Sequence, residues 1–268
     1  MKIALIGCGA IGTILTQAIK DNKVDVKLQC VYDKIEEKGK EFAKKFKTKF
    51  ATLDEILDED LDLVVEAASQ EAVRNLVPRI LKSNKSVMIM SAGALVDDKL
   101  LNEIKSLAKK NNLKVYLPSG AIAGLDGIKS ASVLGINKVI LKTRKPLKSL
   151  EGAPFFEKNK TDLSNIKEPK IVYEGPAKEA VKLFPQNINV AASLSLAGIG
   201  PEKTIIQIIA DPTIDKNIHE IIVEGNFGML HTKTENVPCP DNPKTSYLAA
   251  LSAIATLKKI TEPIQVGT

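Results

Sequence analysis

A glycine-rich segment near the N-terminus is the first feature of the sequence that points to chemistry. Gly7, Gly9 and Gly12 follow an apolar run and open a helix-forming stretch, in the pattern GxGxxG. The first glycine of this pattern permits a tight turn, the second lets the backbone approach a pyrophosphate, and the third allows close packing of helix on strand. The free N–H groups of the helix then face the anion. The segment predicts a dinucleotide site, which also includes Ala10 and Ile11.

An acidic residue follows this segment at the spacing that a dinucleotide site requires. Asp33 ends the second predicted strand, about 20 residues beyond Gly12. A carboxylate at this place accepts the two ribose hydroxyls of an adenosine and repels the additional phosphate of NADP. Taken alone, Asp33 could equally cap the following helix. Together with the glycines it predicts NAD as the favoured cofactor, and the adjacent Lys34 leaves room for some use of NADP.

Three further loops have compositions that suit a ligand site. Residues 66–69 and 91–94 are rich in Ala, Gly and Ser and follow predicted strands. Ligands of open parallel sheets bind beyond the carboxyl ends of the strands, so we expect these loops to contact the cofactor through Ala67, Ala68, Ser91 and Ala92. The alternative is that their small side chains only ease packing. The third loop, 118–124, lies at the predicted boundary between two domains, where ligand sites are frequent.

The chain contains two histidines, and only one of them fits a catalytic role. Removal of a hydride from an alcohol or amine carbon also releases a proton, which a general base must accept. His231 alternates with Lys233 and Glu235 along a predicted strand, so we expect it to face solvent. His219 shares its face with apolar residues such as Ile221 and follows a turn rich in Asp and Asn that could orient the ring. It is the candidate base, and a structural buried histidine is the alternative.

Other catalytic chemistries find no support in the sequence. The cysteines, Cys8, Cys30 and Cys239, are odd in number and show no CxxC spacing, so neither a disulfide framework nor a cysteine zinc site is expected. No carboxylate lies at a ligand spacing from either histidine, and we predict no metal site. The absence of GxSxG and GxxxxGK[ST] patterns leaves hydrolase and ATPase functions without a motif.

The elements that must position these residues alternate regularly over the first 117 residues. Short apolar runs of the kind found in buried parallel strands occupy residues 3–6, 27–32, 61–66, 86–90 and 114–117. Amphipathic helical segments lie between them at residues 11–20, 35–46, 71–82 and 97–111. This alternation predicts the α/β class, with a doubly wound, Rossmann-type parallel sheet in a dinucleotide-binding domain of residues 1–120.

The second half of the chain is richer in strands. Predicted strands occupy residues 138–143, 171–173, 204–209, 219–224 and 229–235. They indicate an α+β domain of residues 121–244, for substrate binding and dimerisation, whose sheet has one more open face. Gly175 and Pro176 are expected to cap and open a helix that ends near residue 183. We expect a polar surface insertion at 148–169, a proline-rich turn at 236–243, and a terminal helix within 245–268 that packs back on the first domain.

The overall composition limits the function classes further. The chain has 268 residues, of which 44% are hydrophobic and 26% charged, as in an average globular protein. Its net charge is +6, yet only three of 38 basic residues are arginine and there is no Trp, which argues against a nucleic-acid partner. No apolar stretch reaches the roughly 18 residues of a transmembrane helix, and the N-terminus lacks a signal-peptide core. We predict a cytoplasmic enzyme without a membrane partner.

Four segments resemble the L-aspartate dehydrogenases of archaea and bacteria. They are Pro-Ser-Gly-Ala-Ile at 118–122, Phe-Pro-Gln-Asn-Ile-Asn-Val-Ala-Ala at 184–192, Ala-Asp-Pro at 210–212 with Asn-Ile-His at 217–219, and Asn-Pro-Lys-Thr-Ser at 242–246. The resemblance spans the chain, and these motifs are far more specific than the glycine pattern. It implies NAD(P)-dependent oxidation of L-aspartate to iminoaspartate, which hydrolyses to oxaloacetate and ammonia. It also implies a homodimer, and a supply of iminoaspartate to quinolinate synthase in de novo NAD biosynthesis.

The resemblance assigns roles to individual residues. It implies that His219 is catalytic and that Ala121 and Asn189 contact the nicotinamide, with Asn189 and His219 also beside the substrate. The two substrate carboxylates need donors, and arginines are scarce. Lys244 and Thr245 are our candidates, because they are expected to begin the last helix, whose N-terminus favours an anion. The alternative is that Thr245 only caps that helix.

Two other readings compete with this one. A related two-domain oxidoreductase, similar to dihydrodipicolinate reductase or homoserine dehydrogenase, would share the same plan and differ in substrate. A regulator that binds NAD without turnover would normally carry a helix–turn–helix for DNA, and the sequence offers no candidate for one.

Overall fold

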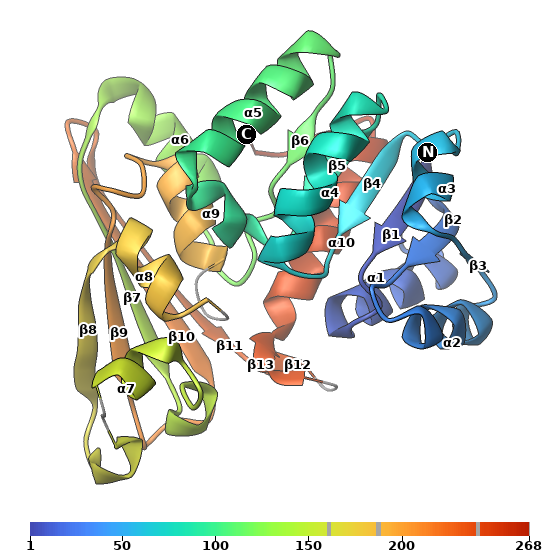
Figure 1. The fold of residues 1–268 in the computed structure, drawn as a ribbon. Helices are drawn as coiled ribbons and strands as arrows, with labels where there is room; N and C mark the ends of the chain where they lie inside the picture. Colours follow the sequence, from blue (N-terminus) through green and yellow to red (C-terminus); the bar gives the residue numbers. More distant parts are fainter. Residues whose placement is uncertain (160–161, 186–188, 240–241, 268) are drawn as a thin grey trace. The chain divides into compact units, whose positions relative to one another are not determined.

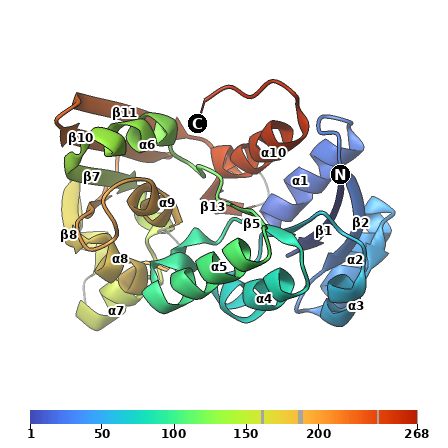
Figure 2. The same cartoon turned by 90° about the horizontal axis from the view of Figure 1, so that it is seen from above.

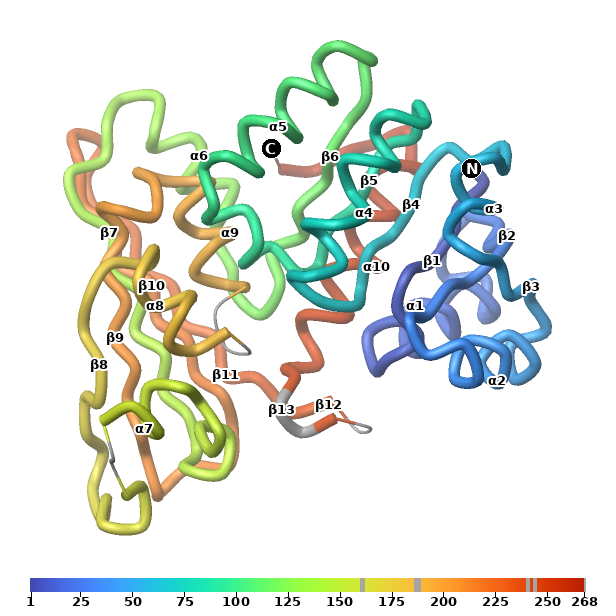
Figure 3. The backbone as a smooth tube through the Cα atoms, viewed as in Figure 1, coloured from blue at the N-terminus to red at the C-terminus, as the bar shows by residue number. Residues whose placement is uncertain are grey.

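The chain folds into two compact units. The computed structural model describes residues 1–159, 162–185, 189–239 and 242–267. The first unit comprises Met1–Pro118 and Ala250–Val266, and the second comprises Ser119–Ala249. Each contains a sheet of its own (Figure 1). The chain leaves the first unit after β6 and returns to it only with the final helix, a path that can be followed in Figure 3.

The first unit is built on a six-stranded parallel sheet. In chain order its strands are β1 (Lys2–Ile6), β2 (Lys27–Tyr32), β3 (Lys49–Phe50), β4 (Leu63–Glu66), β5 (Ser86–Ile89) and β6 (Val115–Tyr116). They lie in the order β3-β2-β1-β4-β5-β6, and each neighbouring pair is parallel. This is the strand order of a Rossmann-type dinucleotide fold, so the predicted doubly wound sheet is confirmed.

Helices cover both faces of this sheet, which explains why its strands are apolar throughout. The helical elements are α1 (Ala10–Lys20), α2 (Glu36–Phe46), α3 (Leu53–Asp58), α4 (Gln70–Lys82), the 3-10 helix η1 (Ala92–Val96), α5 (Asp98–Lys110) and, at the C-terminal end, α10 (Tyr247–Thr261). Figure 2 shows α1 and α10 on one face and α4 and α5 on the other. Ala253 and Leu257 of α10 are fully buried in one core cluster with Leu15 and Val31.

Two short elements of the first unit, β3 and α3, were not predicted. β3 contains two residues and exists through its pairing with β2, so it leaves almost no local pattern. α3 does have a sequence signal, a capping box at its start. The Thr52 hydroxyl accepts the N–H of Glu55 at 3.3 Å, and the Glu55 carboxylate accepts the N–H of Thr52 at 2.6 Å. This Thr-x-x-Glu pattern marks a helix start that could be read from the sequence.

The second unit is a mixed five-stranded sheet covered by helices on one face. Its strands are β7 (Ile136–Lys145), β8 (Lys170–Pro176), β9 (Ile205–Ala210), β10 (Asn217–Gly225) and β11 (Gly228–Asn236), in the order β11-β10-β7-β9-β8. Only β7 and β9 are parallel neighbours. The helices α6 (Leu125–Leu134), α8 (Ala177–Leu183) and α9 (Asn189–Ala197) lie along one face (Figure 1). Residues of β7 and β10 accordingly alternate between buried and partly exposed, which confirms the predicted α+β character.

Two local expectations for the second unit were wrong. Residues 236–243 do not form a simple turn, because β12 (Pro238–Cys239) pairs antiparallel with β13 (Asn242–Ser246), and the last helix starts later, at Tyr247. Pro176 ends β8 and is the N-cap of α8 rather than its first helical residue.

The polar insertion predicted at 148–169 is exposed over most of its described residues, as expected, but a few of its apolar side chains contribute to the core. It contains η2 (Leu147–Ser149), α7 (Pro154–Asn159) and η3 (Leu163–Asn165). Phe155 of α7 stacks on Phe184 with ring centroids 5.1 Å apart, and Phe156 and Tyr173 meet the same ring edge-on.

None of the helices within the described ranges combines the length and apolar character that crossing a bilayer requires.

Candidate functional site

The glycine loop of the first unit joins β1 to α1, and each of its glycines has a separate physical reason. Gly7 has a φ of +103°, and a Cβ there would lie 2.5 Å from the carbonyl oxygen of Ala67. A Cβ at Gly12 would overlap the carbonyl oxygen of Gly7. Gly9, the N-cap of α1, would meet nothing within 4 Å. Two glycines therefore permit the turn and its packing, whereas Gly9 keeps the backbone open toward a ligand.

Asp33, at the end of β2, forms a hydrogen bond to this loop. Its carboxylate accepts the N–H of Cys8 at 2.8 Å and the N–H of Ile35 at 3.0 Å, and the Lys38 ammonium lies 3.4 Å away. Burial alone would raise the pKa of Asp33, but the two N–H donors and Lys38 outweigh it, so the pKa falls below its ordinary value. The N-cap of α2 is Ile35 rather than Asp33. An ionised carboxylate thus lies beside the loop at neutral pH, as the ribose contact requires.

Glu66, the last residue of β4, is a buried carboxylate that sequence reasoning did not single out. It is fully buried and accepts N–H groups of Ala68, Ser69 and Ser91 at 2.9–3.0 Å and the Ser91 hydroxyl at 2.8 Å. Burial raises the pKa of Glu66 even though these four donors oppose it. The carboxylate joins the loops after β4 and β5, so Ala67, Ala68, Ser91 and Ala92 are held at the sheet edge where the glycine loop lies.

His219 lies on β10 in the second unit with its side chain almost fully buried, at 4% exposure. It pairs in register with Thr143 of β7, whose hydroxyl lies 3.1 Å from the ring Nδ1. Burial, and secondarily the charge of Lys145, lower the pKa of His219 to about 3. The imidazole is therefore neutral. Its hydrogen-bond partner is Thr143 and not the preceding turn, where Asp211 is engaged by Arg144 and Thr213.

The loop after β6 is fixed near this histidine by β11. Thr234 pairs in register with His219, and its hydroxyl donates to the carbonyl oxygen of Ala121 at 2.9 Å. The Asn236 amide donates to the same oxygen at 3.0 Å. Asn189 is half-buried at the start of α9, and a Cβ at Gly120 of the same loop would lie 3.6 Å from the adjacent Val190. The second unit thus brings Ala121, His219 and the start of α9 together. Part of the 184–192 motif, residues 186–188, lies outside the described residues.

The predicted carboxylate site at the start of the last helix is wrong in its geometry. Lys244 and Thr245 belong to β13, and α10 begins only at Tyr247. The reason is non-local, because Ser246 pairs with Pro238 and the N–H of Tyr247 donates to Val237 at 2.9 Å. Strand pairing occupies the backbone that the helix would have used, so neither residue belongs to the first turn of α10.

Sequence reasoning also missed a lysine on the buried face of the second sheet. Lys145 ends β7, is only 4% exposed, and lies two residues beyond Thr143 on the same face. Burial lowers the pKa of Lys145 to about 8. The predicted strand stopped at residue 143, so this lysine was counted with the solvated ones. The alternation of buried residues Val139, Leu141 and Thr143 was the signal that could have found it.

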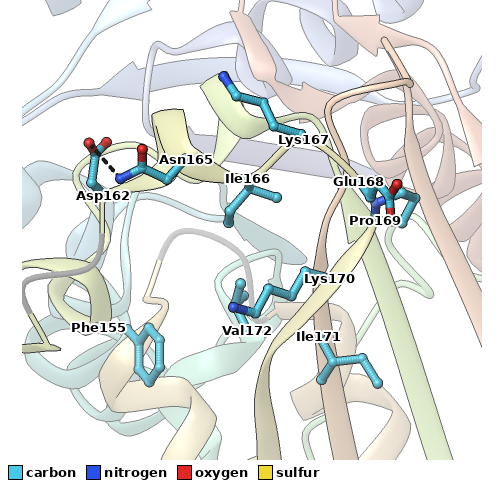
Figure 4. Close-up of a pocket in the computed structure, with 10 residues that line it drawn as sticks. All are labelled: Phe155, Asp162, Asn165, Ile166, Lys167, Glu168, Pro169, Lys170, Ile171 and Val172. Atoms are coloured by element: carbon cyan, nitrogen blue, oxygen red, sulfur yellow. Dashed lines mark hydrogen bonds between the residues drawn. The ribbon is translucent and has the colours of Figure 1, made fainter.

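Two further observations bear on ligands. Within the described ranges, no three His, Cys, Asp or Glu side chains lie close enough together to hold a metal ion. Figure 4 shows a surface cavity of about 730 Å³ in the second unit, where Asn165 donates to Asp162 at 3.1 Å. Its lining runs from Phe155 to Val172 and includes neither His219 nor Lys145, so we assign it no part in the chemistry.

Comparison with known proteins identifies the family. A family model described as "Aspartate dehydrogenase, C-terminal" matches residues 126–260, and "Homoserine dehydrogenase, NAD binding domain" matches residues 7–118. The chain is 53% identical to the L-aspartate dehydrogenase of Methanococcoides burtonii over the whole of both proteins. This chain belongs to the L-aspartate dehydrogenase family. The resemblance seen in the sequence motifs is thereby confirmed.

Other relatives of the family agree with this placement. The L-aspartate dehydrogenase of Methanothermobacter thermautotrophicus is 47% identical over 100% of this chain and 99% of its own. The crystal structure of aspartate dehydrogenase from Thermotoga maritima matches with a TM-score of 0.78 at 32% identity, over 100% of this chain and 99% of that one. The scyllo-inositol dehydrogenase of Lactobacillus casei, at 17% identity and a TM-score of 0.59, shares the fold alone.

Proposed function

We propose that this protein oxidises L-aspartate at its amine carbon with NAD(P) as hydride acceptor. The product is iminoaspartate, which water converts to oxaloacetate and ammonia. The observation that carries the proposal is the neutral, buried imidazole of His219, held by Thr143 in a chain of the L-aspartate dehydrogenase family. The related readings, a dihydrodipicolinate reductase-like or homoserine dehydrogenase-like enzyme, have less support, because the family model that matches the second unit is that of aspartate dehydrogenase.

The residues of the first unit fit a dinucleotide. Gly9 leaves its surroundings open and begins α1, so the helix N–H groups can face a pyrophosphate. We assign this contact to the segment from Gly7 to Gly12 and the ribose contact to Asp33, whose ionised carboxylate favours NAD over NADP. The loops held by Glu66 would line the cofactor through the residues Ala67, Ala68, Ser91 and Ala92. When bound, the nicotinamide supplies the hydride acceptor, and we assign its contacts to Ala121 and Asn189.

His219 supplies the proton acceptor in this proposal. With the Nδ1 proton donated to the Thr143 hydroxyl, the lone pair on Nε2 is available to the substrate. A neutral ring can accept a proton from the substrate ammonium or from the water that attacks the imine. Because burial keeps the free ring neutral well below pH 7, its charge does not compete with substrate binding at any working pH.

The test is a substrate panel combined with two histidine variants. L-aspartate, D-aspartate, glutamate and homoserine are assayed with NAD and NADP by absorbance at 340 nm. We expect activity with L-aspartate, and activity on homoserine alone would refute the assignment. His219→Ala should lower kcat by about 10²–10⁴-fold with an unchanged Kd for NADH. His231→Ala is the matched control, since His231 is exposed and pairs with Glu220 at 2.9 Å. A His219→Ala rate within threefold of the parent would remove His219 from the mechanism.

We also propose a homodimer in which the second units associate. Val133, Leu134 and Met229 are 89%, 61% and 69% exposed and lie around one groove between α6 and β11. Exposed apolar side chains gathered at one place are typical of an interface. Light scattering of the purified chain tests this, and a monomer at micromolar concentration would contradict it. A cytoplasmic location and the supply of iminoaspartate to quinolinate synthase stay predictions, for which fractionation and a coupled assay are the measurements.

A further inference from the structure

Aspartate carries two carboxylates, and the predicted site for one of them does not exist as a helix terminus. The buried face of the second sheet offers other polar groups. Polar residues gather there at the ends of adjacent strands, in a region where apolar side chains would otherwise be expected. They are Thr143 and Lys145 of β7 and Asn217 and His219 of β10, joined by Ser246 of β13 in the small two-stranded sheet, all at most 7% exposed.

Lys145 is placed beside the candidate catalytic histidine by strand register. Thr143 pairs with His219 and Arg144 pairs with Ile218, so Lys145 follows at the end of β7 that lies against the start of β10. Thr143 and Lys145 share the buried face of β7. The charge of Lys145 is close enough to His219 to help lower its pKa.

The side chain of Asn217 provides a hydrogen-bond acceptor on the same buried face as the Lys145 ammonium. Its side chain is 2% exposed, and its amide nitrogen donates to the Ser246 hydroxyl at 3.3 Å. Its Oδ1 is buried and has no hydrogen-bond partner in the described part of the chain. An unsatisfied buried acceptor is costly, and functional sites are where such a cost is tolerated. An N–H donor of a ligand would satisfy it.

We propose that Lys145 binds a carboxylate of the amino-acid substrate while Asn217 Oδ1 accepts a hydrogen bond from its amine, beside His219. The three buried groups match the three parts of an α-amino acid that must be recognised. Lys145 is a cation for the carboxylate, Asn217 is an acceptor for the ammonium, and neutral His219 is a base for the proton that leaves. This proposal rests on the function proposed above and specifies which residues recognise the substrate.

The arrangement has a consequence for the base. The positive charge of Lys145 disfavours a second positive charge on His219. A carboxylate bound to Lys145 offsets that charge, so the pKa of His219 rises once the substrate is in place. Substrate binding itself thus makes the imidazole a stronger base at the moment when a proton must leave.

The first experiment removes the charge of Lys145 and keeps its length. Lys145→Met should raise KM for L-aspartate by about tenfold or more, as expected for the loss of one hydrogen bond to a charged group. The Kd for NADH should not change, and Lys145→Arg should restore part of the affinity. Lys142→Met is the matched control, because Lys142 lies on the other face of the same strand, near Glu220. A KM within twofold of the parent in Lys145→Met would overturn the proposal.

A second experiment separates the two contacts. Succinate has both carboxylates of aspartate and no amine, so its inhibition constant reports the anion site alone. Lys145→Met should weaken inhibition by succinate by about tenfold. Asn217→Ala should raise KM for aspartate and leave succinate inhibition within twofold of the parent. Equal effects of Asn217→Ala on both ligands would show that Asn217 acts only on the packing.

The parent protein supplies a test that needs no variant. Lys145 loses its proton near pH 8, so calorimetric binding of succinate to the NAD-loaded protein should weaken about tenfold per pH unit above that value. His219, whose pKa is lowered to about 3, does not titrate in this range. Constant succinate affinity from pH 7 to 10 would refute the anion site. If the parent binds succinate in this way yet does not oxidise aspartate, the proposed function fails and the anion site stands.

Discussion

The neutral state of His219 makes a quantitative prediction for stability. Burial, together with the charge of Lys145, lowers the pKa of His219 from 6.5 to about 3 in the folded protein. The unfolded chain keeps the ordinary value and therefore binds a proton that the folded chain does not, between about pH 6.5 and pH 3. Stability is thus complete above pH 6.5 and falls as the pH is lowered through this window. Between pH 7.5 and pH 5.5 the loss from this one group is about 1–2 kcal/mol.

The measurement compares urea denaturation at pH 7.5 and pH 5.5 for the parent, His219→Gln and His231→Gln. Carboxylates contribute alike to all three proteins, so the difference between them isolates each histidine. We expect His219→Gln to lose about 1–2 kcal/mol less than the parent on acidification, because glutamine does not titrate and can still bond to Thr143. His231→Gln, which changes an exposed side chain, should behave as the parent does. Equal losses in the parent and His219→Gln would refute the neutral, buried imidazole on which the proposed mechanism depends.

Three further predictions concern the first unit. Asp33→Asn removes the charge and keeps one of the two acceptor oxygens that bond to the N–H groups of Cys8 and Ile35. The preference for NADH over NADPH should fall by about tenfold or more in fluorescence titrations; an unchanged ratio would contradict the ribose contact. Glu66→Gln turns one acceptor oxygen into an NH2 donor that faces other donors. Urea denaturation should show a free energy of unfolding lower by about 1–3 kcal/mol; an unchanged value would mean that the hydrogen bonds of Glu66 are dispensable for stability. Gly9→Ala should keep the melting temperature and weaken NADH binding, because a Cβ at Gly9 would meet no protein atom within 4 Å. Gly12→Ala should lower the melting temperature, because a Cβ at Gly12 would overlap the backbone of Gly7. The same change in melting temperature for both variants would contradict the roles given to the two glycines.

The fold of the first unit was largely predictable because its signals are local. Parallel strands buried on both faces are continuous apolar runs, and the strand–helix alternation then restricts the topology. The elements that escaped prediction depend on contacts distant in sequence. β3 is a strand because it pairs with β2, and Phe155 is part of a core because Phe184 lies against it. Neither fact leaves a trace in the residues immediately around it.

The residues of the site were predictable only where the alternation of apolar and polar residues along a single strand decides which face a side chain takes. The alternation His219, Ile221 and Val223 predicted a buried face, and the structure agrees. The histidine's partner, Thr143, lies 76 residues away in the chain, and Lys145 could be placed on the buried face only by extending the alternation of β7 beyond the predicted strand. Their role depends on strand register, which no stretch of sequence specifies by itself.

The return of α10 to the first unit has a consequence for how the protein is made. Leu257 and Ala253 complete a core whose other members were translated much earlier, among them Leu15 and Val31. The nascent dinucleotide-binding half therefore emerges from the ribosome with an uncovered apolar face, which stays open until α10 has been synthesised. A fragment that stops at Pro118 lacks the helix that covers this face. The whole second unit is synthesised between the two parts of the chain that form the first.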